Sequence, residues 1–420
     1  MTVMLSQSSE ADVLAAALSA GALRPEFQPI VDLYTGELVA VEALARWPGI
    51  PGADPGTVFA AAASCGATAR LDWACRIAAI EAALDGDLDP STALFVNVES
   101  ATLGQDAPRE YQGLIRRAQG RLRMVLELTE RDLMTNPAEL LKLVGQARAL
   151  GWGIAMDDVG ADPASLALLP LVAPDVVKLD LSLIHATRAT HQARTLLAVA
   201  AYAEETGAVL LAEGIEAEIH HERARALGAR YGQGWLLGRP APEVSRSKLG
   251  QLPPFNPPTT ADPTPFSLIQ DSPRLRRGTK QLLLDMTHAL ERRAVASEES
   301  AVLLSAFQFA QNFTAGTISR YSEIAEKLPL VAAFGEGMDA RPAPGVRGAD
   351  LRPEDPLTGE WTVVAIGAHY AGALIARDCG DDVADLDRRF DFVLTHDRNL
   401  VLRAGRSLMS RIAVDAATSG

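Results

Sequence analysis

Short apolar runs alternate with helical stretches over roughly the first 250 residues of the chain. Most runs are followed by Ala-, Leu- and Arg-rich segments whose apolar positions recur with the period of a helix. Strand–helix alternation repeated eight times predicts an α/β fold, a (β/α)8 barrel of the TIM type. A doubly wound open sheet is the alternative. The runs are FQPIVDL, ELVAVEAL, ALFVNVES, RMVLELTE, GIAMDDVG, DVVKLD, AVLLAEGIE and YGQGWLLG.

The connection between the first two runs is too short for a crossover helix. Only the sequence YTG, residues 34–36, separates them. We therefore expect an antiparallel hairpin there and an irregular start to the barrel.

A proline-rich segment interrupts the pattern at residues 251–265. Proline fixes φ and removes a hydrogen-bond donor, so we interpret this segment as a semi-extended linker with few contacts. It divides the chain into a barrel domain over residues 1–250 and a smaller α/β domain over residues 266–412.

The composition limits the class of protein. Of the 420 residues, 48% are hydrophobic and 22% are charged, as in soluble proteins. The 39 Lys and Arg against 53 Asp and Glu give a net charge of −14, which repels nucleic acid polymers. The three cysteines show no metal-binding spacing, and we find neither a signal peptide nor an apolar run long enough for a membrane span. We expect a cytoplasmic protein.

Polar side chains collect in or at the carboxyl ends of the apolar runs, where a barrel builds its active site. Strand alternation places Lys178 and Asp180 on one face. Asp157 and Asp158 cannot both point inward in a regular strand, so we expect the strand to end at this doublet, with Gly160 permitting the turn. The full set is Glu42, Asn97, Glu127, Asp157, Asp158, Lys178, Asp180, Glu213 and Gln233.

These residue types indicate a site for hard cations. Many carboxylates in one mouth would raise each other's pKa unless cations lay among them. Oxygen ligands without His or Cys suit Mg²⁺ or Mn²⁺, and an Asp doublet can bind two ions for in-line displacement at phosphorus. Taken singly, Glu42 could be a solvated strand end, Asn97 a turn residue and Lys178 a surface lysine. Their joint placement at seven strand ends indicates a function.

Seven ordered motifs make residues 12–245 resemble the EAL domain of bacterial cyclic di-GMP phosphodiesterases. They are EALAR at Glu42, VNVES at Asn97, ELTE at Glu127, MDDVG at Asp157, VKLD at Lys178, AEGIE at Glu213 and GQGWLLGRP at Gln233. The resemblance implies hydrolysis of cyclic di-GMP to linear 5′-pGpG with two Mg²⁺ or Mn²⁺ ions on an irregular barrel. We also expect a homodimer.

The resemblance further implies a role for each matching residue. Lys178 and Glu213 would orient and help activate the attacking water, and Gln233 would fix the network of metals and water. Gln28 and Arg46 would contact the substrate. Glu130 and Glu216 would steady the loop after the doublet. The implied ligands are Glu42, Asn97, Glu127 and Asp157 for the first ion, and Asp157, Asp158 and Asp180 for the second.

The loop after the doublet departs from the family pattern. Val159, Asp162 and Pro163 stand where the family usually has an aromatic residue, a glycine and a second aromatic residue. The loop should therefore be stiffer and more acidic than usual, although every direct metal-ligand position is retained. The alternative function is a non-hydrolysing cyclic di-GMP receptor that signals by protein contact, and a phosphodiesterase for some other phosphodiester is a third.

The second domain resembles the DICT domain, a sensory module of cyclic-nucleotide signalling proteins. The resemblance is carried by LLSAFQFAQNFTAGTISRY, DPLTGEWTVVAIGAHYAGALIARD and RRFDFVLTHDRNLV. This part shows no nucleophile constellation, so we expect a signalling partner or small ligand here and not catalysis. We expect four aromatic residues to be core and two histidines to be structural: Phe307, Phe309, Phe313 and Tyr321, with His369 and His396.

Overall fold

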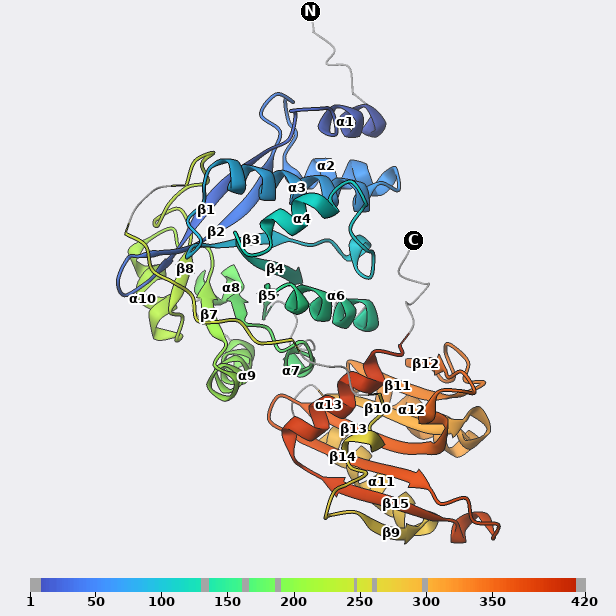
Figure 1. The fold of residues 1–420 in the computed structure, drawn as a ribbon. Helices are drawn as coiled ribbons and strands as arrows, with labels where there is room; N and C mark the ends of the chain where they lie inside the picture. The colour runs from blue at the N-terminus through green and yellow to red at the C-terminus, as the bar shows by residue number, and fades with distance from the viewer. Residues whose placement is uncertain are drawn as a thin grey trace, which may run out of the picture.

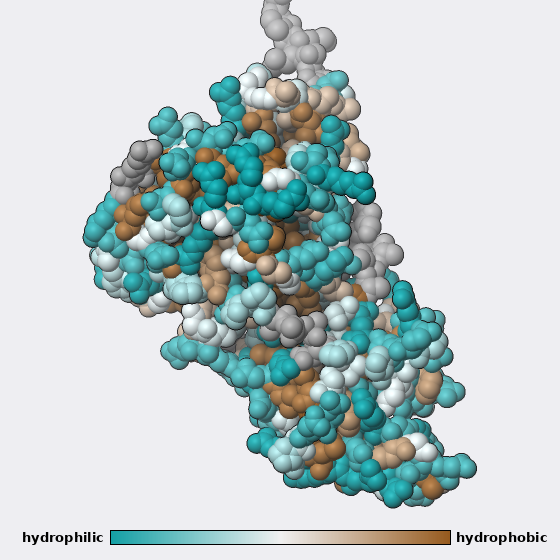
Figure 2. All heavy atoms as spheres, in the orientation of Figure 1, coloured by the Kyte–Doolittle hydropathy of each residue, from teal (hydrophilic) through white to brown (hydrophobic). Residues whose placement is uncertain are grey.

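The structure is a computed structural model that describes residues 9–129, 136–160, 166–185, 190–244, 248–258, 263–296 and 301–412. The chain forms two units, a barrel and a domain built on an open sheet (Figure 1). Hydrophilic residues cover much of the face shown in Figure 2. None of the described helices is both long and apolar enough to cross a lipid bilayer.

The first eight strands close into a barrel, which confirms the predicted TIM-type fold over the open sheet. β1 pairs antiparallel with both β2 and β8, so the predicted hairpin is present, and the other neighbours are parallel. The strands are β1 (Arg24–Asp32), β2 (Leu38–Arg46), β3 (Ala93–Asn97), β4 (Arg123–Thr129), β5 (Gly153–Val159), β6 (Val176–Leu179), β7 (Val209–Ala212) and β8 (Tyr231–Gln233).

Inward-facing apolar side chains fill the barrel below its mouth. Ile30, Phe95 and Leu211 belong to one buried cluster built from the strands, while helices cover the outer face. The helices are α1 (Glu10–Ala17), α2 (Pro55–Ser64), α3 (Thr68–Asp85), α4 (Gln112–Ala118), α6 (Pro137–Ala149), α7 (Leu169–Val172), α8 (Leu181–His185), α9 (Thr190–Thr206) and α10 (Glu218–Ala226), with the 3-10 turn η1 (Ser100–Thr102).

The second unit is a seven-stranded sheet in the order β12-β11-β10-β13-β14-β15-β9, as expected for a smaller α/β domain. Its strands are β9 (Arg276–Thr279), β10 (Ala301–Phe309), β11 (Leu330–Glu336), β12 (Val346–Asp350), β13 (Glu360–Gly367), β14 (Ala371–Asp378) and β15 (Arg389–Thr395). Its helices are α11 (Lys280–Ala296), α12 (Ala315–Ala325) and α13 (Arg398–Met409), with 3-10 turns η3 (Phe266–Leu268), η4 (Ala310–Asn312), η5 (Pro356–Gly359) and η6 (Asp385–Asp387).

The two faces of this sheet bury different helices. Leu303 and Val363 face α11 and α12 in one apolar cluster. Their neighbours along the strands, Leu304 and Val364, face the opposite way and pack with α13. The sheet is therefore covered on both sides, which suits the parallel strands β12, β11 and β10 that form one end of it.

Three of the four predicted core aromatics pack together where α12 meets β10. The rings of Phe307, Phe313 and Tyr321 pack edge to face with centroids 5.0–5.5 Å apart. Phe309 is 39% exposed, so the prediction was wrong for this residue, which ends β10 where the strand reaches solvent. His396 Nδ1 lies 3.0 Å from the carbonyl oxygen of Ala371, in keeping with a structural histidine.

The barrel and the sheet domain share one hydrophobic core. α13 packs against α7, and the buried cluster includes Leu169 and Leu171 from the barrel together with Val401 and Leu408 from α13. In Figure 1, α13 lies between α7 and the sheet. The two units are therefore joined by a packed helix pair as well as by the chain connection.

The proline-rich segment has no helix or strand over residues 251–258, but it packs closely on the barrel. Leu252 is buried at 3% exposure, and Arg123 Nη1 donates to its carbonyl oxygen at 2.8 Å. The backbone N–H of Asn256 donates to Asp175 Oδ1 at 2.6 Å. The expectation of few contacts was therefore wrong, because the apolar residues between the prolines cover the lower end of the barrel.

Candidate active site

Lys178 lies at the centre of the barrel mouth. It comes from β6, and its side chain is only 1% exposed. Its Nζ lies 2.7 Å from Glu127 Oε1 and 2.7 Å from Glu213 Oε1. It also lies 3.2 Å from Asp157 Oδ1 and 3.8 Å from Glu42 Oε2. Residues predicted from separate strand ends thus meet around one ammonium group.

The charges in this cluster shift each other's pKa values. Burial opposes the charged form of Lys178, but the carboxylates around it, Glu127 foremost, outweigh burial and raise the pKa well above its usual range. Burial and the negative charge of Glu42 raise the pKa of Glu127 well above its usual range. Burial also raises the pKa of Glu213 to about 7. The mouth therefore holds more acidic groups than one ammonium can neutralise.

Glu127 is a buried carboxylate whose ion-pair partner among the described residues is Lys178. It is 1% exposed, and Lys178 Nζ lies 2.7 Å from Oε1, but no other described residue donates a hydrogen bond of good geometry to either oxygen. Lys178 is shared with three other carboxylates, so burying Glu127 is costly unless a further cation balances the charge. A divalent cation bound by oxygen ligands meets this requirement, so the residues present fit the predicted metal.

A hydrogen-bond network fixes the β2 side of the mouth. Asn97 Nδ2 donates to Glu42 Oε1 at 3.0 Å. Gln233 Nε2 donates to Glu42 Oε2 at 2.6 Å and to Gln28 Oε1 at 3.0 Å. Burial would raise the pKa of Glu42, but Lys178 and the two amide donors outweigh it and lower this pKa. Glu42 is therefore held as a carboxylate in a defined position.

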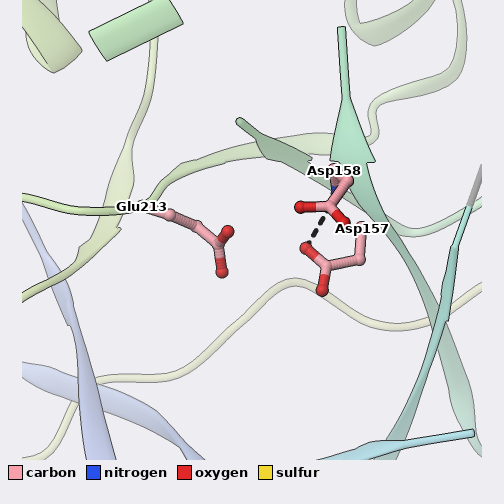
Figure 3. Close-up of side chains that lie close together, drawn as sticks. All are labelled: Asp157, Asp158 and Glu213. Atoms are coloured by element: carbon pink, nitrogen blue, oxygen red, sulfur yellow. Dashed lines mark hydrogen bonds between the residues drawn. The ribbon is translucent and has the colours of Figure 1, made fainter. Parts of the chain in front are cut away.

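A β-bulge brings Asp157 and Asp158 to the mouth together. The prediction that the strand ends at the doublet was wrong, because β5 continues to Val159 and its register with β6 shifts between Met156 and Val159. Asp158 has φ 56°, a left-handed conformation that Asp tolerates better than most residues. Figure 3 shows both carboxylates on the side facing Glu213, and the potential ligand atoms of the three residues lie within 4.8 Å of one another.

Asp180 follows β6 and lies partly buried at the edge of the cluster. Its Oδ1 accepts a hydrogen bond from the backbone N–H of Ser182 at 2.8 Å. Within the described part of the chain, the acidic group compact enough for one ion consists of Asp157, Asp158 and Glu213. Glu213, which the sequence analysis assigns to water activation, is thus also within reach of an ion. Residues 161–165, with the unusual Asp162 and Pro163, lie outside the described residues.

Two predicted residues, Arg46 and Glu216, lie outside the cluster of carboxylates that pair with Lys178. Arg46 Nε donates to Glu26 Oε2 at 3.1 Å, and both side chains are 32% exposed, which places this pair on the rim. Glu216 is exposed, and its backbone N–H donates to Nδ1 of His220 at 3.3 Å. Glu130 lies outside the described residues, so its predicted loop contact stays a prediction.

Sequence reasoning missed a buried support behind Asn97. Asp72 on α3 is 2% exposed and accepts hydrogen bonds from Arg76 Nη2 at 2.6 Å, Thr102 Oγ1 at 2.7 Å and the backbone N–H of Glu99 at 3.3 Å. Burial raises the pKa of Asp72 despite these donors. The contact fixes the segment that follows β3. The sequence signal for this ion pair is Asp72 and Arg76, four residues apart on the apolar face of a helix, since charged residues are rarely buried unless they are paired.

Two curated relatives and one solved structure show what the barrel is similar to. The chain is 30% identical over 222 residues to the probable cyclic di-GMP phosphodiesterase PdeB of Escherichia coli K12, covering 52% of this chain and 42% of that protein. It is 30% identical over 241 residues to the cyclic di-GMP phosphodiesterase RocR of Pseudomonas aeruginosa PAO1, covering 56% and 61%. The PaMucR phosphodiesterase–c-di-GMP complex is 28% identical, with 56% and 97% covered and a TM-score of 0.48.

Both relatives extend beyond the match, which spans about half the length of each. Two family models match this chain in succession. The sensory domain in diguanylate cyclases and two-component systems, DICT, matches residues 267–378. The EAL domain matches residues 11–240, more than half of the sequence. The chain therefore belongs to the EAL-domain family and carries a DICT domain after its barrel.

Proposed function

We propose that this chain hydrolyses cyclic di-GMP to linear 5′-pGpG with two divalent ions, Mg²⁺ or Mn²⁺. The observation that carries the proposal is a cluster of four carboxylates, Glu127 among them, that share one buried ammonium group, that of Lys178. Membership of the EAL family and the names of the relatives support the choice of substrate.

The mouth offers enough oxygen ligands for two ions. When bound, such ions polarise a phosphoryl oxygen and lower the pKa of a bound water. Glu213 lies beside the doublet and can add a further oxygen to either set. We propose Glu42, Asn97, Glu127 and Asp157 for one ion, and Asp157, Asp158 and Asp180 for the other.

Lys178 and Glu213 form the pair placed to orient the attacking water. Their charged atoms lie 2.7 Å apart, and Lys178 Nζ is a hydrogen-bond donor whereas Glu213 accepts. A water that contacts both groups and the phosphate would have a donor and an acceptor side by side. Gln233 keeps Glu42 in place beside this pair through its hydrogen bond of 2.6 Å.

A cavity of about 320 Å³ beside the cluster is the proposed substrate site. It lies between β2, α2 and α3, and both Arg46 and Asn97 line it together with Phe59 and Val96. This volume is in the range of small-ligand pockets. Arg46 provides a planar cation on an otherwise acidic rim, suited to a phosphate or a base. Gln28, bonded to Gln233, borders the same side of the mouth.

We also propose that the C-terminal domain regulates the site through α13. α7 connects β5, which carries the Asp doublet, to β6, which carries Lys178. Arg406 of α13 donates Nε to the carbonyl oxygen of Leu171 at 2.7 Å and Nη2 to that of Pro170 at 2.9 Å. A ligand or partner that moved α13 would therefore act on the segment between the two strands.

The test is incubation of the purified chain with cyclic di-GMP and Mn²⁺, followed by chromatography for 5′-pGpG. We expect product from the parent chain and none after chelation of the metal. Tight binding of cyclic di-GMP without product would favour the non-hydrolysing receptor. Turnover of a simple aryl phosphodiester but not of cyclic di-GMP would indicate another substrate. Sedimentation of the same sample tests the predicted homodimer.

A further inference from the structure

A second cavity, of about 600 Å³, lies outside the catalytic mouth. It is bordered by the outer face of the β1–β2 hairpin, the end of α3 and the segment that follows β8. Its volume is in the range of small-ligand pockets. None of the described residues that line it also lines the proposed substrate cavity. It is therefore a separate candidate site.

One wall of this outer cavity is apolar. Phe27 of β1 and Leu38 of β2 are 5% and 2% exposed and belong to the packed cluster that also contains residues of α3. Val244 packs against the same cluster, and Leu249 lines the cavity with 40% of its surface exposed. The backbone N–H of Leu38 donates to the carbonyl oxygen of Lys248 at 2.9 Å, which joins this segment to the hairpin. The apolar part of a ligand would have a preformed surface to pack against.

The rim of the outer cavity is acidic. Asp87, Asp89 and Glu243 line it and are exposed, and no lysine or arginine is among the described residues that line it. The carboxyl end of α3 lies beside them and adds the negative end of the helix dipole. Lys248, in the same segment as Glu243, pairs with Glu37 at 2.8 Å. The rim therefore attracts a positively charged group.

Thr92 adds a buried hydroxyl group to the wall. Its side chain is 1% exposed, and Oγ1 has no hydrogen-bond partner among the described residues. A buried polar atom without a partner costs stability unless a ligand or a water binds it. The cavity thus combines an apolar wall, an acidic rim and a free hydrogen-bonding group.

We propose that the outer cavity binds an organic ammonium ion with an apolar body. The apolar part packs on Phe27 and Leu38. The ammonium group, which has N–H donors and no acceptor, pairs with the rim carboxylates and with the Thr92 hydroxyl. An anion would be repelled by the rim, and a purely apolar ligand would leave the hydroxyl without a partner.

α3 lines both cavities. Ala82 and Ala83 border the outer cavity, whereas Arg76 and Ala79, less than two turns earlier, border the proposed substrate cavity. A ligand in the outer cavity would therefore touch the helix that also borders the substrate. The proposal itself concerns binding and does not rest on the proposed function.

The test is a titration of the full chain, followed by NMR, with three phenyl compounds of similar size and different charge. Phenethylamine is a cation at neutral pH, phenethyl alcohol is neutral and hydrocinnamate is an anion. We expect the amine to bind at least about tenfold more tightly than the alcohol, and the anion to bind most weakly. Added salt should weaken binding of the amine and leave that of the alcohol unchanged, because it screens exposed charges.

The double variant Asp87→Asn with Glu243→Gln removes rim charges and keeps the backbone. Asn tolerates the left-handed φ of 52° at position 87 as Asp does. The affinity for phenethylamine should fall by at least about fivefold, and that for phenethyl alcohol by less than about twofold. Glu81→Gln with Asp85→Asn is the matched control, because both residues are exposed on α3 and neither lines the cavity. The control should leave both affinities unchanged.

Thr92→Val tests the interior of the site, since valine keeps the shape and removes the hydroxyl. Binding of phenethylamine should weaken by about threefold. The unfolding temperature of the ligand-free chain should not fall, because the lost hydroxyl had no partner among the described residues.

Three outcomes would overturn the proposal. They are equal binding of the three compounds, an equal loss of phenethylamine binding in the rim variant and its control, and no binding of the amine at all. Unchanged affinity for the amine in both the rim variant and Thr92→Val would place the ligand elsewhere and would also overturn it. Each titration is made without cyclic di-GMP, so the result is independent of turnover.

Discussion

The β2 and β5 sides of the mouth hold their carboxylates in different ways. Glu42 is 7% exposed, and amide donors from Asn97 and Gln233 bind both of its oxygens. Asp158 is exposed and stands at a bulge with a left-handed backbone. The first carboxylate is positioned by neutral neighbours before any ligand binds. The second depends on the backbone that carries it.

The difference follows from the elements behind each side. Glu42 and Gln28 face each other across the β1–β2 ladder, so the β2 side is braced by sheet pairing. The chain after the doublet leads to α7, which contacts α13 of the second domain. The β2 side is held in place and can set where the substrate lies. The β5 side is attached to another domain, so the position of its carboxylates can be adjusted. Three substitutions test this division, from the largest expected effect to the smallest.

Glu127→Gln should abolish hydrolysis without unfolding the barrel. Glu127 is buried and shares Lys178 with three other carboxylates, so in the proposed ligand set its charge would bind the metal and would cost stability in the metal-free chain. We expect turnover to fall by at least about 10²-fold, while the unfolding temperature without metal is equal to or above that of the parent. Product chromatography and thermal unfolding followed by circular dichroism measure the two effects.

Glu291→Gln is the matched control for that substitution. Glu291 is also 1% exposed with one unpaired oxygen, but it lies on α11 and pairs with Arg320 at 2.7 Å. It should leave catalysis near the parent level. A Glu127→Gln chain that retains full turnover in saturating Mn²⁺ would remove this residue from the ligand set.

Asp158→Asn should raise the metal requirement while keeping the fold. Asn tolerates a positive φ as Asp does, so the bulge survives, but the amide is a poorer metal ligand. We expect the Mn²⁺ concentration for half-maximal turnover to rise about tenfold, a loss of about 1.4 kcal/mol in binding. Asp158→Ala should in addition lose about 1 kcal/mol of folding stability through backbone strain. An unchanged Mn²⁺ titration would mean that Asp158 binds no ion.

Arg406→Ala should change activity by a few-fold while leaving the metal titration of the β2-side ligands intact. The substitution removes two charged hydrogen bonds from α7 carbonyls, each contributing about 1.5–3 kcal/mol. Arg411→Ala is the control, because Arg411 bonds Asp355 of its own domain at 2.7 Å and the carbonyl oxygen of Pro263 in the connecting segment. Steady-state kinetics of both variants measure the effect. Equal kcat and KM in Arg406→Ala and Arg411→Ala would show that the α13–α7 contact does not influence the active site.

The sequence allowed the barrel and the residues around Lys178 to be predicted, because each strand ends in polar residues that a barrel must bring together. It did not predict the bulge at Asp158, since a bulge depends on how β5 pairs with β6 and not on β5 alone. The apolar pattern of α13 indicates a buried face. It cannot show that part of this face meets Leu171, more than 200 residues earlier.

Two smaller differences have the same origin. Asp72 could not be assigned because its donors come from Arg76 on its own helix and from Thr102 beyond the next strand. The sequence predicts a linker with few contacts around Leu252 because prolines prevent regular structure, but prolines do not prevent packing. In each case the missing information is a contact between distant parts of the chain.

The packed proline-rich segment limits how the two domains can be exchanged between proteins. The ring of Phe255 lies against Gly153, where an added Cβ would come within 2.9 Å of it, and the guanidinium carbon of Arg123 lies 4.3 Å from the ring centroid. A chimaera joined at residue 250 would replace this covering and expose the lower end of the barrel. A junction after Pro258 keeps it, so a new sensor is best grafted there together with residues that match the α7 surface.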